Sequence, residues 1–196
     1  MKQDISYKNC IILLSGFAGT GKLTTAKELV KDPSFRLVDN HTIANPILGL
    51  IPLDGFTPIP DSAWEKVAKI RDTVFETMRE LSPSHFSFVI TQEMIEGDPY
   101  PKLFYNLVTQ LVADRKSTFF PVRLECNEAE LVKRVKSANR RELHKTIDSD
   151  RSIHQVRNEK VFYSHHPNEL TINNSDKSPK QVAGIILEHL KKIMPL

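Results

Sequence analysis

Short apolar runs alternate along the chain with longer segments in which apolar residues recur at helical spacing. Residues 10–14 are apolar at every position, which is typical of a strand buried on both faces of a parallel sheet. Between residues 61 and 81, apolar residues instead recur every three or four positions, as in an amphipathic helix. This alternation predicts an α/β fold in which helices cover both faces of a parallel sheet. The predicted strands are 10–15, 35–39, 86–91, 118–125 and 170–173, and the predicted helices are 22–31, 41–50, 61–81, 98–115, 128–136, 152–163 and 178–192.

The loop between the first strand and the first helix carries the most specific motif. Three of the chain's seven glycines fall within six positions there, and a lysine follows the last of them. Glycine lets the backbone adopt left-handed angles and approach an anion closely. Successive N–H groups and the start of the helix then surround phosphate oxygens, and the lysine reaches the terminal phosphates. The motif predicts a P-loop that binds a nucleotide through Gly16, Phe17, Ala18, Gly19, Thr20, Gly21, Lys22, Leu23 and Thr24.

One position departs from the strict P-loop pattern. Ser or Thr usually follows the lysine and holds Mg²⁺, whereas here Leu23 follows it and Thr24 comes one position later. We therefore expect Thr24 to bond a phosphate oxygen, and Mg²⁺ to be held by the phosphates, waters and Thr24 or a carboxylate. The alternative interpretation is a glycine turn that closes a strand–helix joint, with Lys22 as a solvated surface residue.

Polar residues end the predicted strands at the edge of the sheet where parallel α/β proteins bind ligands. Asp39 ends the second strand, where its carboxylate could accept a proton from a substrate hydroxyl or join a metal site. A helix-capping role is the alternative for Asp39. His41 is a candidate for substrate binding, with a capping or surface role equally open. Glu93 is the only acid directly beyond the third strand, where many P-loop proteins carry a carboxylate that organises Mg²⁺, and it is a further candidate substrate residue.

Positive charge is concentrated in one segment of the chain. The formal net charge is +3, but residues 133–160 hold nine Lys/Arg against four Asp/Glu, a local balance of +5. Arginines stabilise the charge that spreads over a transferred phosphoryl group, and an exposed basic segment is typical of a mobile lid that excludes water. We expect such a lid at about residues 137–152, with Arg141 as a catalytic residue and Arg140 near the substrate. A solvated charged face is the alternative.

Composition and cysteine usage fit a single globular domain over residues 1–196. The chain is 40% hydrophobic and 26% charged, and its length is ample for a packed core. No apolar stretch approaches the roughly 20 residues of a membrane span, and the first residues lack the apolar core of a signal peptide. Cys10 and Cys126, at predicted strands, favour buried thiols in a reducing compartment. We therefore expect a cytoplasmic protein with no membrane partner, either a monomer or a homodimer.

Together these residues resemble the nucleoside-monophosphate-kinase-like branch of P-loop proteins, which includes adenylate, shikimate and gluconate kinases and chloramphenicol phosphotransferase. Residues 16–24 are similar to the adenylate kinase loop, and residues 35–39 to the second strand of the small-molecule kinases, whose terminal Asp faces the acceptor hydroxyl. Residues 130–135 and the following Arg140-Arg141 resemble the helix and lid arginines of this branch. The resemblance implies a three-layer P-loop fold with a five-stranded parallel sheet in the order 2-3-1-4-5. It also places Arg134 against the adenine and Asn174 in the adenine-edge loop.

The chain departs from these relatives where they bind the acceptor. Thr91-Gln92-Glu93 stands in place of the Gly-Gly-Gly loop of shikimate kinase, and His41 replaces the second acid of its Asp-x-Asp. The Asp-Gly-Phe-Pro-Arg-like segment of adenylate kinase is absent as well. These differences argue against shikimate or a nucleoside monophosphate as the acceptor, whose pocket we expect between residues 43–60, the long helix and residues 94–98.

The sequence therefore predicts an ATP-dependent phosphotransferase that moves the γ-phosphate to a hydroxyl of a small molecule. Lys22, Asp39 and Arg141 are its expected catalytic residues, and ATP with Mg²⁺ its expected cofactors. One alternative is a nucleotide-binding regulatory module without an acceptor, which the lack of a clear Walker B acid favours. The other is a kinase acting on a nucleic-acid end. That function needs a long basic stripe outside the lid, where this chain is slightly acidic, so a nucleic-acid partner is disfavoured.

Overall fold

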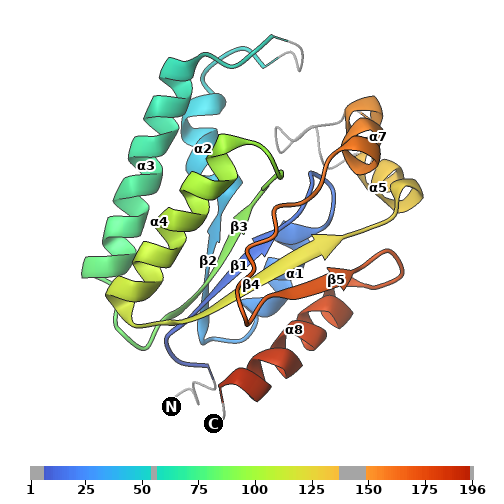
Figure 1. Cartoon of the computed structure of the whole chain (residues 1–196). Helices are drawn as coiled ribbons and strands as arrows, with labels where there is room; N and C mark the ends of the chain where they lie inside the picture. Colours follow the sequence, from blue (N-terminus) through green and yellow to red (C-terminus); the bar gives the residue numbers. More distant parts are fainter. Residues whose placement is uncertain (1–6, 54–56, 137–148, 195–196) are drawn as a thin grey trace.

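Five parallel strands form the centre of the molecule. A computed structural model describes residues 7–53, 57–136 and 149–194 (Figure 1). The strands lie in the order β2-β3-β1-β4-β5, and every neighbouring pair is parallel. This confirms the predicted strand order, and it brings all five carboxyl ends to one edge of the sheet. The strands are β1 (Cys10–Ser15), β2 (Phe35–Asp39), β3 (Ser87–Gln92), β4 (Thr118–Glu125) and β5 (Leu170–Asn173).

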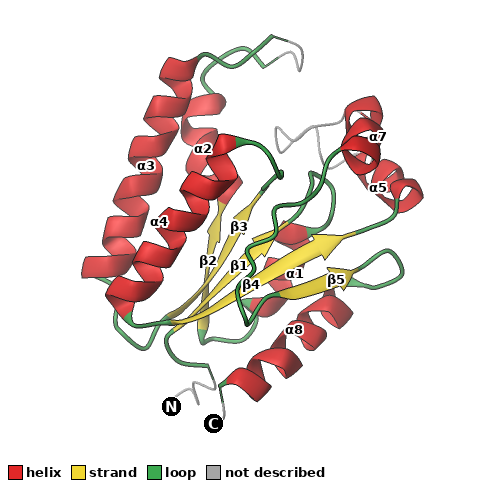
Figure 2. Cartoon of the chain, viewed as in Figure 1, coloured by secondary structure: helices red, strands yellow, loops and turns green. Residues whose placement is uncertain are grey.

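Helices cover both faces of the sheet, so the predicted three-layer architecture is confirmed (Figure 2). Helices α3 and α4 pack on one face, and α1 and α8 pack on the other. Helices α5 and α7 contact each other beside the carboxyl ends of the strands. The helices are α1 (Lys22–Leu29), α2 (Asn40–Leu48), α3 (Asp61–Glu80), α4 (Pro99–Arg115), α5 (Glu128–Val135), α7 (Ser149–Asn158) and α8 (Pro179–Ile193).

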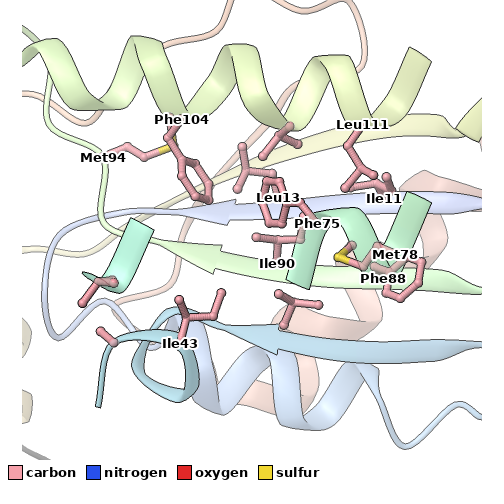
Figure 3. Packing of buried hydrophobic residues seen from close by; sticks show 14 of the residues in the cluster. Ile11, Leu13, Ile43, Phe75, Met78, Phe88, Ile90, Met94, Phe104 and Leu111 are labelled. Atoms are coloured by element: carbon pink, nitrogen blue, oxygen red, sulfur yellow. The ribbon is translucent and has the colours of Figure 1, made fainter. Parts of the chain in front are cut away.

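The core has two parts because side chains alternate across β1. Ile11 and Leu13 point to the face covered by α3 and α4, where they pack with Phe75 and Phe104 (Figure 3). Ile12 and Leu14 join the cluster on the opposite face, under α1 and α8. A strand buried on both faces has no polar face to show, which explains its uninterrupted apolar run.

Two predictions about helices need correction. The helix expected at 152–163 begins at Ser149 and ends at Asn158. The next residues are extended because Val161 forms an antiparallel bridge with Ile95, and the N–H of Phe162 donates to the Met94 carbonyl at 3.1 Å. The apolar stripe of the long helix also does not bury its first large member, since Trp64 is 46% exposed.

Both cysteines are free and buried, as expected. Burial raises the pKa of the Cys10 thiol to about 12, and it also raises the pKa of the Cys126 thiol. A thiol with a raised pKa stays protonated and is a poor nucleophile at neutral pH. We therefore assign both cysteines to packing. None of the helices within residues 7–53, 57–136 and 149–194 is long and apolar enough to cross a membrane.

Candidate active site

The loop between β1 and α1 follows a path that only glycine can take at two of its positions. Gly16 has φ +152° and Gly19 has φ +93°. A Cβ on Gly16 would lie 2.6 Å from the backbone oxygen of Leu124, and one on Gly19 would lie 2.9 Å from a methyl carbon of Leu131. Side chains here would meet neighbouring elements, so the glycines let the loop curl against β4 and α5. The result is a compact loop of P-loop geometry at the carboxyl edge of the sheet.

The start of α1 completes this loop. Gly21 precedes the helix with φ +88°. The Gly21 carbonyl accepts a hydrogen bond from the N–H of Thr25 at 3.0 Å. The N–H groups of the preceding turn lie at the helix end, where no carbonyl within the helix can accept from them. The Thr20 hydroxyl donates to the Phe17 carbonyl at 2.9 Å and fixes the middle of the loop. This arrangement of left-handed glycines and a helix N-terminus fits a bound phosphate.

Lys22 lies across the loop that precedes it. Its Nζ donates to the carbonyl oxygens of Gly16 and Phe17 at 2.8 and 2.9 Å. The ammonium group is thus placed over the backbone that would surround a phosphate. A lysine at this place supplies a compact positive charge to phosphate oxygens.

Thr24 and Leu23 point to different partners. The Thr24 hydroxyl donates to the Gly21 carbonyl at 2.8 Å, and Thr24 is exposed at the start of the helix. Leu23 lines a neighbouring cavity instead. The described residues hold no cluster of three or more His, Cys, Asp or Glu side chains that could bind a metal ion. Of the two residues after Lys22, only Thr24 therefore offers an oxygen ligand for Mg²⁺ held by nucleotide phosphates.

Arg134 and Asn174 meet beside Thr20 in the loop between β1 and α1. Two nitrogens of the Arg134 guanidinium donate to the side-chain and backbone oxygens of Asn174, each at 2.9 Å. The Asn174 amide in turn donates to the Thr20 carbonyl at 2.7 Å. Arg134 also bonds Glu130 at 2.8 Å, and this hydrogen bond holds the pKa of Glu130 below its usual range. The two residues expected at the nucleotide base are thus brought together against the P-loop.

Replacing Asn174 with alanine is expected to destabilise the protein by about 1–3 kcal/mol, because Asn174 is 3% exposed and its loss leaves the Thr20 carbonyl without this donor. Denaturant unfolding of the variant measures this change. Asp176→Ala is the control, since the Asp176 side chain lies nearby and is 80% exposed. Equal stability of both variants would show that the Asn174 bonds contribute little.

Glu93 lies against the P-loop rather than open to an acceptor. Its Oε1 accepts from the backbone N–H of Ala18 at 3.2 Å and from the side-chain amide of Gln155 at 3.3 Å. The carboxylate therefore joins the loop after β3 to the P-loop and to α7. The backbone N–H of Ala18, in the P-loop, is therefore already hydrogen-bonded to the Glu93 side chain.

Asp39 sits at the end of β2 and begins α2. It is 4% exposed, and its Oδ1 accepts from the Thr91 hydroxyl at 2.6 Å. Its Oδ2 accepts from the backbone N–H of His41 at 3.1 Å, so the carboxylate caps the helix. The Nδ1 atom of His41 lies 3.3 Å from the same oxygen. The structure thus brings the predicted base and the predicted substrate residue into direct contact.

A cavity of about 550 Å³ opens beside these residues. It is bounded by the first turns of α1, by β2 and by α2. Part of the expected acceptor region is present, because Asn45 and Pro46 contribute to the wall. The long helix and residues 94–98, which we also expect around the acceptor, are not among its lining residues. Its lining residues are Leu23, Lys27, Leu37, Asp39, His41, Thr42, Asn45 and Pro46.

Comparison with solved structures shows which proteins share this fold. A gluconokinase from Sinorhizobium meliloti has 12% identity and a TM-score of 0.61, with 95% of this chain and 94% of that chain covered. A candidate kinase from Chloroflexus aurantiacus has 15% identity and a TM-score of 0.67, with 95% and 98% covered. Shikimate kinase from Aquifex aeolicus has 14% identity and a TM-score of 0.53, with 93% and 97% covered. The chain has the P-loop kinase fold. No protein-family model matches the sequence, and no curated protein matches it.

Some of the predicted site residues lie outside the described part of the chain. Arg140 and Arg141 are among them, as is most of the lid expected at 137–152. The end of that range belongs to α7, which begins at Ser149. The roles of the two arginines therefore stay predictions.

Two residues to which the sequence analysis gave no role support the candidate site. Thr91 bonds Asp39 directly, because the two residues pair in the register of β2 and β3. Both predicted strands end in a polar residue, and aligning those ends would have indicated this pair. Gln155, which is 3% exposed, bonds Glu93 from α7. Nothing in the local sequence around Gln155 indicates that contact, because 62 residues separate the two.

Proposed function

We propose that this protein is an ATP-dependent phosphotransferase that moves the γ-phosphate to a hydroxyl of a small molecule held beside Asp39 and His41. The position of the 550 Å³ cavity carries this proposal. Its wall includes Leu23, the residue after the P-loop lysine, and also Asp39 and His41. A molecule in the cavity would therefore lie next to the terminal phosphate of a nucleotide in the P-loop.

The residues proposed for the site would divide the work between phosphate binding and charge stabilisation. The backbone N–H groups at the start of α1 would bind the phosphates, and Lys22 would exchange its two carbonyl partners for phosphate oxygens. Arg134 would lie against the base, and Arg141 would stabilise the charge on the transferred group. Mg²⁺ bound to the phosphates, with Thr24 as the nearby hydroxyl, would neutralise their negative charge. The acceptor hydroxyl oxygen bonds to the γ-phosphorus as the bond from phosphorus to ADP breaks.

ADP release by the purified full chain, measured with and without a panel of hydroxylated metabolites, tests this function. We expect ATP consumption to rise on addition of one acceptor class and a phosphorylated product to form in equal amount. Mass spectrometry of the product would identify the acceptor. ATP binding without acceptor-dependent turnover across the panel would contradict the proposal.

One observation favours the second candidate, a nucleotide-binding regulatory module. Glu93, the acid expected to organise Mg²⁺, is bonded to Ala18 and Gln155 instead. If the module hypothesis is correct, ATP should bind and change the proteolysis pattern or hydrogen exchange of α7 without any transfer to the panel. The same assay therefore separates the two functions.

A further inference from the structure

Asp39 is held by bonds that a freely acting base would not need. Thr91 donates to one carboxylate oxygen at 2.6 Å, and the backbone N–H of His41 donates to the other at 3.1 Å. Only 4% of the residue is exposed. Its role as the cap of α2 depends on these bonds, because the carboxylate satisfies an N–H group of the first turn. The carboxylate therefore presents little surface to a molecule in the cavity.

The His41 side chain is more accessible from the cavity than the Asp39 carboxylate is. Its Nδ1 atom is buried and lies 3.3 Å from the Asp39 Oδ2. The side chain as a whole is 35% exposed and lines the cavity. Since Nδ1 is buried, the exposed area belongs to the other atoms of the side chain. The ring thus connects the buried carboxylate to the space in which the acceptor would lie.

The contact between the two residues follows from their spacing at the end of β2. Asp39 caps α2 and His41 is the second residue of that helix, so the carboxylate that binds the His41 N–H also lies beside its ring. The 3.3 Å contact is within the range of an ion pair but lacks the alignment of a hydrogen bond. Catalytic pairs commonly have such loose geometry before substrate binds.

We propose that His41 is the general base of the phosphoryl transfer and that Asp39 is the residue that positions it. This inference rests on the proposed function. A neutral ring that donates from Nδ1 to Asp39 leaves Nε2 as an acceptor for a proton. Nε2 takes the proton of the acceptor hydroxyl while the hydroxyl oxygen bonds to the γ-phosphorus. The bond between that phosphorus and the bridging oxygen breaks, and ADP leaves with its electron pair.

The first experiment is nitrogen-15 NMR of the histidine rings in the full chain, which needs no acceptor. We expect the neutral His41 ring to carry its proton on Nδ1. In Asp39→Ala no side-chain oxygen remains at this position to accept from Nδ1, so the proton is expected to move to Nε2. A wild-type ring protonated on Nε2 would overturn the proposal.

The second experiment measures turnover with the acceptor that the metabolite panel provides. His41→Gln is expected to lower kcat by about a hundredfold or more, with the KM for ATP unchanged, because general base catalysis typically contributes that much. His85→Gln is the matched control, since His85 is exposed and lies at the opposite edge of the sheet. Asp39→Asn is expected to retain ATP binding and to lower kcat as well.

The outcomes separate this proposal from the function on which it rests. A His41→Gln variant with normal kcat and a raised KM for the acceptor would make His41 a binding residue and refute the base assignment alone. A wild-type protein without acceptor-dependent turnover would refute the phosphotransferase function, and with it any catalytic role of His41.

Discussion

Replacing Lys22 with methionine is expected to lower acceptor-dependent ATP turnover by about a hundredfold or more, as loss of one charge-stabilising group typically does. Methionine keeps the length of the side chain but removes the charge that would lie on the terminal phosphates. The fold should persist, because the two carbonyl oxygens that Lys22 bonds, those of Gly16 and Phe17, belong to its own loop. Steady-state kinetics measures the loss, and circular dichroism checks the fold.

Lys31→Met is the control for the charge change at Lys22. Lys31 follows α1, is exposed and pairs with Glu28 on the surface, so it should retain full activity. Unchanged ATP consumption in Lys22→Met would remove the main support for phosphate binding in this loop. Loss of activity in both variants would indicate a general effect of lowered positive charge on α1.

Replacing Gly16 with alanine is expected to lower the free energy of unfolding by about 2 kcal/mol or more, because positive φ strain and a steric clash add together. The new Cβ would lie 2.6 Å from the backbone oxygen of Leu124 and 2.6 Å from the Thr20 hydroxyl. Since β4 is a central strand, its backbone cannot shift without disturbing the pairing with β1. Denaturant unfolding and nucleotide titration would both register the change.

Substitutions at two other glycines distinguish the effect of backbone strain from that of a steric clash. Gly97 has φ +90° but no atom within 4 Å of an added Cβ, so Gly97→Ala should show only the strain, about 1–2 kcal/mol. Gly184 lies exposed within α8 with nothing nearby, and Gly184→Ala should stabilise by about 0.5–1 kcal/mol. A Gly16→Ala variant no less stable than Gly97→Ala would show that the loop relaxes around the new methyl group.

The sheet could be predicted from the sequence because its strands carry short apolar runs, as in β1, where every residue is buried. The bounds of β1, β2, β4 and β5 are as predicted, and β3 is displaced by one residue. Their order in space is not encoded in periodicity, since parallel neighbours are joined through helices rather than turns. It came from the resemblance that the motif at residues 16–24 supports.

The contacts around the site were harder to predict because they join distant segments. Gln155 and Glu93 meet only once α7 is placed beside the P-loop. The sequence predicts that this helix continues to residue 163, because residues 159–163 contain no helix-breaking residue. In the structure α7 ends at Asn158. Val161 is extended in the structure because its backbone pairs with that of Ile95. Hydrogen bonding to a distant segment therefore overrides local helix propensity there, and a local stretch of sequence does not reveal such a contact.

Asp39 shows how the structure adds contacts to a residue that the sequence singles out. Its position at the end of β2 was predictable, and so was its alternative as a helix cap. The hydrogen bond from Thr91 and the ring of His41 became visible only with the register of β2 and β3. The structure therefore turns two separate candidates into one pair.

The two sides of the candidate site come from different parts of the chain. The cavity is built by β2, α2 and one face of α1, whereas Arg134 and Asn174 meet the P-loop from α5 and the segment before α8. Substitutions at Thr42, Asn45 or Pro46 can thus reshape the cavity without touching the nucleotide side. Under the proposed function, such a division would leave the acceptor preference open to stepwise divergence and to redesign while ATP binding stays unchanged.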